Sequence, residues 1–279
     1  MSKKQKDFTK VTFSPDFSRF GCDGIDADHF ALLSKRVYDM AGTTPRDVKV
    51  YLNGDKLDVL DFKSYCRLYF APTSEELAAK AAAEEETAKS YLDDDDDDDE
   101  EYVPGGAAKK KKAPKKKKAP KKKDKFIYEK INDRWEVCIA VSRDQQQQQV
   151  SFCNGICTSK GGEHVKWIAD DVAKKIIPLA KKAFKGVDIK ASQIKHSMFV
   201  FINALISNPS FDSQTKETLT TRHAKFGPAE FKPKLSDKFC KDVVKNSDLV
   251  DEVLHYARAK VRRAMERKMG GSKKSKLSG

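Results

Sequence analysis

The feature that most constrains how this chain can fold is a long block of charge in its middle. Residues 75–125 contain 14 lysines and 15 acidic residues, and they run from "DDDDDDDEE" into "KKKKAPKKKKAPKKK". Blocks of like charge bury no apolar surface, so we expect this segment to stay disordered. We therefore predict four segments: a first folded part at 1–72, a linker at 73–125, a second folded part at 126–256, and a basic helix end and tail at 257–279.

The charged linker admits three interpretations. The simplest is a solvated connection between two domains. Clusters of lysine also serve as nuclear-import signals, and they attract DNA phosphates without reading sequence. The net charge of +13 lies mainly in the ends of the chain, because the first ten residues contribute +3 and residues 257–279 contribute +8. The folded parts therefore need not be general binders of polyanions.

The six cysteines and five histidines do not form a metal-binding pattern. There is no CxxC pair, and a structural zinc site needs more ligands at closer spacing, so we expect free thiols and no metal site. Cys153 and Cys157 lie four residues apart in an apolar run, and within one strand they would face the same side. No apolar run reaches membrane-spanning length and no signal peptide precedes the fold, which favours a soluble intracellular protein without a membrane partner.

The first folded part has the patterns of a small α/β unit. Residues 11–13 ("VTF") alternate like a strand. The stretch "DADHFALLSKRVYDMAG" predicts a helix that is capped by Asp26 and ends at Gly42. The Asn-Gly pair at 53–54 predicts a hairpin, and residues 62–70 are predicted to be helical. The apolar face expected for the first helix comprises Phe30, Leu33, Val37 and Met40.

The second folded part carries longer patterns. The helix predicted at 163–184 carries an apolar stripe on one face, which consists of Val165, Ile168, Ala169, Val172, Ile176 and Leu179. Within this helix, Pro178 is expected to kink the helix or to end its regular part. Asp248 is the expected cap of the last helix. Strands followed by helices in this order predict an α+β fold. The predicted strands are 126–131, 134–142, 149–159 and 196–206, and the predicted helices are 163–184, 236–246 and 248–268.

The loop "NPSFDSQTKETLT", residues 208–220, follows the last apolar strand and carries Lys216. By residue type alone, Lys216 is either a solvent-facing loop lysine or a cation held out toward an anion. The surrounding residues favour the second interpretation. The string "VSFCNGICTSKGGEHVKWIADDV", followed by "FVFINALISNPSFDSQTKETLT", closely resembles the transducer domain of eukaryotic type IIA DNA topoisomerases, which has a ribosomal protein S5 domain 2-like fold.

A second resemblance covers the first part of the chain. The strings "VTFSPDFSRFG", "DADHFALLSKRVYDMAG", "VKVYLNGDKL" and "FKSY" resemble the final part of the GHKL-type ATPase domain of the same family. The two matches occur in the family's order and cover about two thirds of the chain. The resemblance implies a nuclear, ATP- and Mg²⁺-dependent enzyme that passes DNA strands, and it implies DNA and a homodimeric or complementing topoisomerase chain as partners.

The resemblance assigns ATP-binding roles to four residues. In the family, the loop that contains Gln214, Thr215 and Lys216 reaches into the nucleotide pocket of the GHKL domain. There, Gln214 would support the loop and the Lys216 ammonium would meet the γ-phosphate, whose loss on hydrolysis removes its partner. Thr9 resembles the threonine that contacts the adenine region; otherwise it is a threonine chosen for strand propensity.

Two further features are carried over from the family. Gly161 and Gly162 match a Gly-Gly pair that permits a tight strand-to-helix turn. Lys181, Lys182 and Lys185 match a lysine-rich stretch that faces the transported DNA segment, although a solvated helix end explains them equally well.

The motifs that such an enzyme needs for ATP hydrolysis and strand cleavage do not occur in these 279 residues. GHKL hydrolysis uses an Asn for Mg²⁺, a catalytic Glu and Gly-rich loops, and cleavage uses a tyrosine in a winged-helix domain with an acidic Mg²⁺ cluster. The run of Asp at 93–99 lacks the fixed geometry that Mg²⁺ requires. We therefore expect a truncated ATPase/transducer region that is inactive alone and has no catalytic residue of its own.

Two alternatives remain open. The chain could be a non-enzymatic module that associates with DNA or chromatin through its Lys-rich linker and basic tail. It could also descend from the mismatch-repair or chaperone branches of the GHKL group, although the "SFDSQTKE" loop argues against them.

Overall fold

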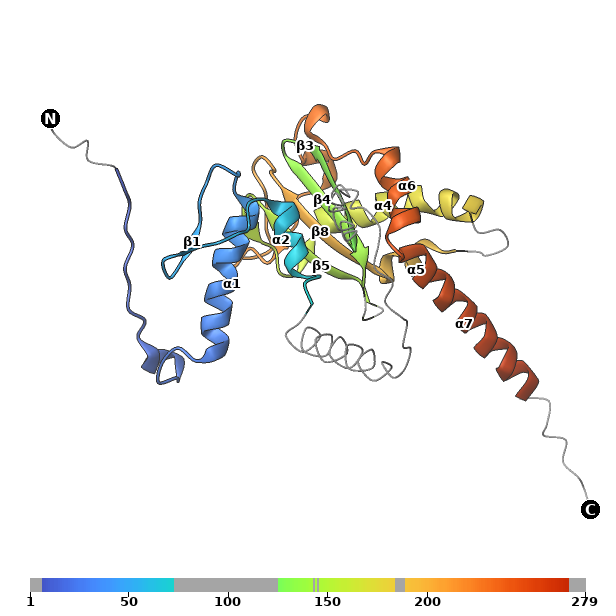
Figure 1. Ribbon diagram of the computed structural model, residues 1–279, viewed down its shortest axis with the longest axis horizontal. Coiled ribbons are helices and arrows are strands. Elements are labelled where there is room, and N and C mark those ends of the chain that lie inside the picture. The colour runs from blue at the N-terminus through green and yellow to red at the C-terminus, as the bar shows by residue number, and fades with distance from the viewer. Residues whose placement is uncertain (1–6, 73–124, 143, 145, 184–188, 271–279) are drawn as a thin grey trace, which may run out of the picture.

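The computed structural model describes residues 7–72, 125–142, 144, 146–183 and 189–270. The predicted linker therefore lies outside the described residues, apart from Lys125, as do Lys185 and the tail from 271 onward. The two folded parts together form an α+β structure (Figure 1).

A five-stranded sheet forms the centre of the molecule. All its neighbouring strands are antiparallel except β5 and β8, which are parallel. The strands predicted at 126–131 and 134–142 are confirmed, and β3 and β4 pair across the turn between them. In spatial order the strands are β3 (Phe126–Asn132), β4 (Trp135–Val141), β8 (Met198–Ala204), β5 (Gln148–Cys153) and β6 (Ile156–Cys157).

The strand predicted at 149–159 is instead two strands, β5 and β6. Asn154 and Gly155 have positive φ of 53° and 77° and reverse the chain between them. This turn changes the relation between the two cysteines that flank it. Cys153 belongs to the core on one face of the sheet, whereas Cys157 packs against the core on the other face. The expectation that they share a side is therefore wrong.

Helices cover one face of the sheet and enclose the larger core. The predicted apolar stripe of α4 is confirmed: Val165, Ile168, Ala169, Val172 and Ile176 are buried and Leu179 packs at the edge. The helix continues through Pro178 to Ala183, so the proline does not end it. On this face lie α4 (Glu163–Ala183), α5 (Ala191–His196), α6 (Asp237–Asn246) and α7 (Leu249–Gly270).

The two C-terminal helices begin close to their predicted positions. Asp248 stands before α7 and its carbonyl accepts the amide of Glu252 at 3.0 Å, as expected of a residue at the cap position. The side-chain oxygen that accepts from the first turn belongs to Ser247, at 3.4 Å from the amide of Leu249. The first half of α7 is buried, with Leu249, Val250, Val253 and Leu254 in the core, and the rest projects from the body (Figure 1).

The opposite face of the sheet is covered by the first part of the chain. The helix α2 (Phe62–Leu68) is capped by Asp61 and lies across this face (Figure 1). Phe62 and Tyr65 contact Phe152 edge-on, with ring centroids 6.2 and 5.6 Å apart. Aromatic pairs of this kind add to the free energy gained by burial. Residues on both sides of the charged linker therefore share one core.

The helix α1 (Ala27–Thr43) presents a different face to the protein from the one predicted. Its cap is confirmed, because the Asp26 carboxylate accepts the amide of His29 at 2.8 Å. Of the four residues predicted to face inward, Val37 packs against the core. Phe30, Leu33 and Met40 are about half exposed, and the buried residues of the helix are Asp39, Ala41 and Gly42. The reason is the packing of α2.

Gly42 and Asp39 determine how α1 meets α2. A Cβ on Gly42 would lie 2.5 Å from Cγ of Tyr65, so only a glycine admits the tyrosine ring there. The hydroxyl of Tyr65 donates to the Asp39 carboxylate at 2.7 Å, and Lys35 donates to the same carboxylate at 2.9 Å. A charged residue is thus buried with its partners, and the apolar stripe of α1 faces outward.

The remaining elements are short. The hairpin at 53–54 is confirmed, with positive φ at Asn53 and Gly54. Residues 7–16 contain no strand, so the strand predicted at 11–13 is wrong; this segment extends away from the body (Figure 1). The short elements are η1 (Phe17–Phe20), β1 (Tyr51–Leu52), β2 (Asp55–Lys56), β7 (Gly161–Gly162), β9 (Thr218–Leu219), η2 (His223–Lys225) and η3 (Ala229–Phe231).

Candidate functional site

The loop that contains Lys216 is closed by hydrogen bonds between its two arms. Phe211 and Leu219 form an antiparallel bridge. The amide of Thr220 donates to the carbonyl of Ser210 at 2.9 Å, and the amide of Asp212 donates to the carbonyl of Thr218 at 3.2 Å. These bonds make residues 208–220 a defined projection with its tip at 213–217.

Lys216 holds an unusual backbone conformation at this tip. Its φ is +58°, in the left-handed region that non-glycine residues seldom occupy. Its amide donates to the carbonyl of Ser213 at 3.1 Å, and the hydroxyls of Ser213 and Thr215 are 2.8 Å apart. Gln214 and Thr215 are exposed and Lys216 is half-buried. A left-handed residue that its surroundings hold in place is the kind of strain found at ligand-binding loops.

Asp212 closes the tip on its other side. Its carboxylate accepts the amide of Thr218 at 3.2 Å and the hydroxyl of Ser213 at 3.3 Å. The hydrogen bonding from Thr218 lowers the pKa of this carboxyl, so Asp212 is ionised at neutral pH.

The base of the loop is attached to the segment that leads into α4. The Lys160 ammonium lies 2.6 Å from the Glu217 carboxylate, and the amide of Lys160 donates to the carbonyl of Glu217 at 3.0 Å. The hydrogen bond to Glu217 raises the pKa of Lys160. One residue further on, β7 pairs with β9 in parallel, Gly161 with Thr218 and Gly162 with Leu219.

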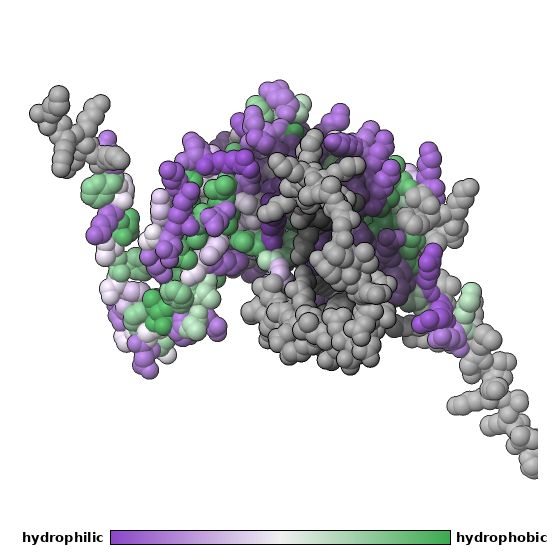
Figure 2. Space-filling view, viewed as in Figure 1, coloured by the Kyte–Doolittle hydropathy of each residue, from purple (hydrophilic) through white to green (hydrophobic). Residues whose placement is uncertain are grey.

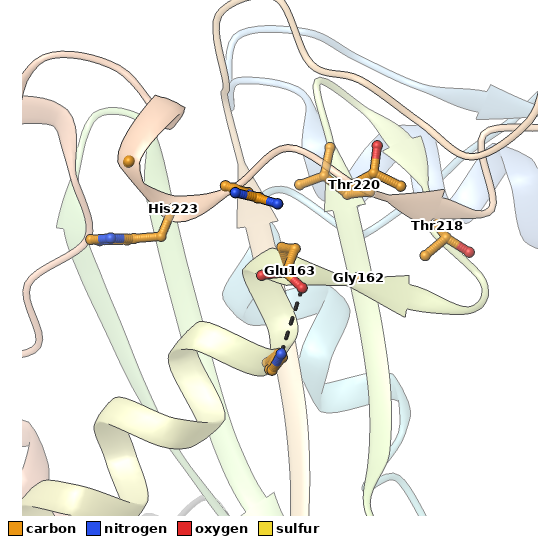
Figure 3. Close-up of a pocket in the computed structure, with 9 residues that line it drawn as sticks. Gly162, Glu163, Thr218, Thr220 and His223 are labelled. Atoms are coloured by element: carbon orange, nitrogen blue, oxygen red, sulfur yellow. Dashed lines mark ion pairs between the residues drawn. The ribbon is translucent and has the colours of Figure 1, made fainter.

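An open cavity of about 750 Å³ lies beside this junction (Figure 3). Thr218 and Thr220 stand at one end and His223 at the other, with Glu163 between them. The Lys166 ammonium is 3.7 Å from the Glu163 carboxylate. The lining thus mixes both signs of charge with hydroxyl groups. It consists of Gly162, Glu163, Lys166, Thr218, Leu219, Thr220, Arg222, His223 and Ala224.

Beneath the junction, three buried polar side chains connect the sheet to the first turn of α4. The hydroxyls of Ser151 and Thr158 are 2.5 Å apart, and the Thr158 hydroxyl lies 3.2 Å from Nε2 of His164. All three residues are fully buried. Burial lowers the pKa of His164 to about 3, so its imidazole is neutral at physiological pH.

The buried histidine predicts a pH dependence of stability. An unfolded histidine titrates near 6.5, whereas His164 in the fold takes up a proton only near pH 3, so acid favours the unfolded chain. Its contribution is fully present above pH 6.5 and is lost as the pH falls from about 6.5 toward 3, by about 1.4 kcal/mol per pH unit. Urea unfolding between pH 7 and 4 should therefore show a shallower loss in His164→Gln than in the wild type. The exposed His196→Gln serves as the control, and an unchanged slope in His164→Gln would contradict the assignment.

The structure places the other predicted site residues that it describes in two different regions. Thr9 is exposed on the segment 7–16, which extends away from the sheet, so the structure does not bring it to the Lys216 loop (Figure 1). Lys181 and Lys182 are exposed in the last turn of α4. Only Gln214, Thr215 and Lys216 share one site.

Metal-binding groups are absent from the described ranges. No group of three or more His, Cys, Asp or Glu side chains there could hold a metal ion. None of the six cysteines, all of which lie in the described ranges, forms a disulfide, and burial raises the pKa of Cys153 to about 12 and that of Cys240 to about 11. These two thiols stay protonated and are poor metal ligands. A search of the described helices also finds none that could cross a membrane.

Comparison with known proteins identifies the family. A model of the DNA gyrase B family matches residues 99–271, which is more than half of the chain. The chain belongs to the DNA gyrase B family. Within it, "DNA topoisomerase 2" of Bombyx mori is 39% identical over 279 residues, and "DNA topoisomerase 2-alpha" of Homo sapiens is 36% identical over 275 residues. The alignments cover 100% and 98% of this chain but 15% of each relative.

Solved structures of this family share the fold. The ATPase region of Saccharomyces cerevisiae topoisomerase II superimposes with a TM-score of 0.60 at 36% identity, over 87% of this chain and 49% of that one. The ATPase and transducer domains of DNA topoisomerase II from Balamuthia mandrillaris give 0.59 at 32% identity, over 84% and 46%. The resemblance to type II topoisomerases and the fold of an ATPase/transducer region are thus confirmed, and the chain spans about half of the solved ATPase regions.

The sequence did not reveal Lys160 and Glu217 as partners. They are 57 positions apart in the numbering, and a lone Lys and a lone Glu carry no pairing signal. Gly161 and Gly162 were predicted only to permit a tight turn. One signal in the sequence could have indicated this contact. Leu219 is an apolar residue within a polar loop, which indicates that the loop returns to the core.

Proposed function

We propose that the chain serves as the ATPase/transducer region of an ATP-dependent type II DNA topoisomerase, with Lys216 as its contact to the terminal phosphate of ATP. The observation that carries this proposal is the preformed loop 208–220, which holds Lys216 in a strained conformation at its tip. A flexible surface lysine would not need bonds between the arms of its loop or a positive φ.

The proposed role of Lys216 depends on where its ammonium group is held. An ammonium group neutralises charge on a terminal phosphate and loses its partner when that phosphate leaves. Because the loop is attached to the start of α4, a change at Lys216 would be transmitted to the sheet and its helices. The described residues offer no carboxylate or histidine cluster for Mg²⁺, so the metal and the remaining nucleotide contacts would come from another polypeptide segment.

The surface of residues 7–72 supports a contact with another polypeptide segment. Phe30, Leu33 and Met40 form an apolar stripe on α1 with 51–55% of each side chain exposed, and Phe8 and Phe13 on the N-terminal segment are 81% and 77% exposed. Figure 2 shows hydrophobic side chains gathered at this end of the molecule. Large apolar patches indicate interaction sites. We infer that these apolar residues are covered by ATPase-domain polypeptide, either in a complementing chain or in a homodimer. We place this assembly in the nucleus.

The test is to measure ATP turnover with and without such a polypeptide. We expect the 279-residue chain alone to hydrolyse no ATP. When it is mixed with a polypeptide that carries the Mg²⁺, adenine and Gly-rich motifs of a related topoisomerase (the complemented assembly), we expect turnover to appear. Hydrolysis by the pure chain, or a complex that forms without any turnover, would contradict the proposal.

The second candidate is a non-enzymatic DNA-associated module. The projecting half of α7, where Arg258 and Arg262 are exposed, and the exposed Lys181 and Lys182 favour it. In this case binding to duplex DNA falls steeply with salt, with a log–log slope of about −0.9 for each phosphate neutralised, and Lys216→Ala leaves it unchanged. A binding constant insensitive to salt would exclude this candidate.

A further inference from the structure

Gly162 lies directly against the backbone of Leu219, at the end of the Lys216 loop. A Cβ at this position would lie 2.3 Å from the carbonyl oxygen of Leu219 and 2.6 Å from its amide nitrogen. Both are backbone atoms, so no side chain can move aside to admit even a methyl group. The φ of Gly162 is +137°, which L-residues rarely adopt.

The preceding glycine does not make this approach. Gly161 also has a positive φ, +77°, but a Cβ there would meet only side chains of Gln149 and Val165 at 3.5 Å, an ordinary contact distance. The Gly-Gly pair therefore does more than permit a tight turn. Its second member allows two backbones to touch.

The backbone that Gly162 touches leads directly to Lys216. Leu219 is fully buried in the main core, and Thr218 pairs with Gly161. Glu217 is bound by Lys160 through both its carbonyl and its carboxylate. Three consecutive residues after Lys216 are thus fixed to the segment 160–162.

We propose that Gly162 is a positioning residue for Lys216, and that the Lys160–Glu217 ion pair is a second attachment for the same loop. The proposal rests on the function proposed above, because it concerns the amine that would meet the phosphate. By this attachment, the start of α4 and the tip of the loop move as one unit. Gly162 itself touches no ligand.

Hydrogen–deuterium exchange on the full chain tests this attachment without any nucleotide. In Gly162→Ala, we expect the amides of Asp212, Thr218 and Thr220 to exchange at least about tenfold faster, since their bonds depend on the pairing of β7 with β9. The matched control is Gly161→Ala, which strains the same strand without the backbone clash and should change these rates by no more than about threefold. Equal effects of the two substitutions would overturn the proposal.

Lys160 provides a milder variant if Gly162→Ala does not fold. Lys160→Ala should speed exchange of the same amides about two- to fivefold, which is the size expected for an exposed ion pair. Lys160→Arg should restore the wild-type rates, whereas Lys166→Ala, which removes the neighbouring pair with Glu163, should leave them unchanged. Rates unaffected by Lys160→Ala, or equally raised by Lys160→Arg and Lys166→Ala, would contradict the role of the pair.

A nucleotide measurement separates this inference from the proposed function. In the complemented assembly, Gly162→Ala should lower kcat at saturating ATP, in the same direction as Lys216→Ala, because a misplaced ammonium stabilises less of the charge that develops in the transition state. If the exchange result holds but neither Gly162→Ala nor Lys216→Ala affects ATP, the positioning is real and the proposed function is wrong. If Lys216→Ala alone affects ATP, the proposed function stands and the positioning role of Gly162 is wrong.

Discussion

Replacing Phe62 with alanine is expected to lower the free energy of unfolding by about 3–5 kcal/mol. The side chain is 1% exposed, and its ring lies 6.2 Å from those of Tyr65 and Phe152. Its removal leaves a cavity between α2 and the sheet, at the contact that holds the first part of the chain on the second. Urea unfolding followed by tryptophan fluorescence measures the change.

The control for this substitution is on the same helix. Leu68 is 44% exposed, so Leu68→Ala should cost no more than about 1 kcal/mol. If Phe62→Ala costs as little as Leu68→Ala, α2 does not pack on the sheet as described. The two parts of the chain would then be independent units joined only by the charged linker.

Replacing Lys216 with methionine is expected to lower ATP turnover of the complemented assembly by about 10²-fold, in the range found when one group that stabilises charge in a transition state is removed. Methionine keeps the length of the side chain and the β-carbon, so the backbone strain at φ +58° is unchanged and only the charge is lost. The control is Lys225→Met, which removes an exposed lysine a few residues along the chain. Equal turnover in the two variants would show that the Lys216 charge has no part in the reaction.

The elements that were predicted best from the sequence are those whose own side chains are buried in the core, because burial fixes the spacing of their apolar residues. The stripe of α4 and the strand β8 are buried along one core, so the spacing of their apolar residues was sufficient to locate them. The hairpin at 53–54 was predicted correctly because an Asn-Gly pair favours the tight turns that connect strands. These elements confirm the α+β class.

Two of the failed predictions depend on contacts that no local pattern encodes, whereas the turn that divides 149–159 carries a local signal, the Asn-Gly pair at 154–155, that the prediction missed. The stripe of α1 was expected to face inward, but Gly42 and Asp39 accept Tyr65 and turn it outward. Residues 11–13 have the alternation of a strand, but no described strand pairs with them, and a strand needs a neighbour. Both errors concern the first part of the chain, where the apolar surface is left uncovered.

The site was predictable only in part. The resemblance located Lys216 and its loop before any geometry was known, and the structure adds the left-handed backbone and the bonds between the loop's arms. The sequence could not show that Gly162 touches the backbone of Leu219, because contact between residues 57 positions apart is a property of the fold. The assignments of Thr9, Lys181, Lys182 and Lys185 remain predictions.

The most direct test of the account compares nucleotides that differ only in their terminal phosphate. The affinity of the complemented assembly for a non-hydrolysable ATP analogue and for ADP should be measured by calorimetry, in the wild type and in Lys216→Met. If the Lys216 amine meets the γ-phosphate, the substitution weakens binding of the analogue by about tenfold or more and leaves ADP binding unchanged. An equal effect on both nucleotides, or none on either, would contradict the central claim.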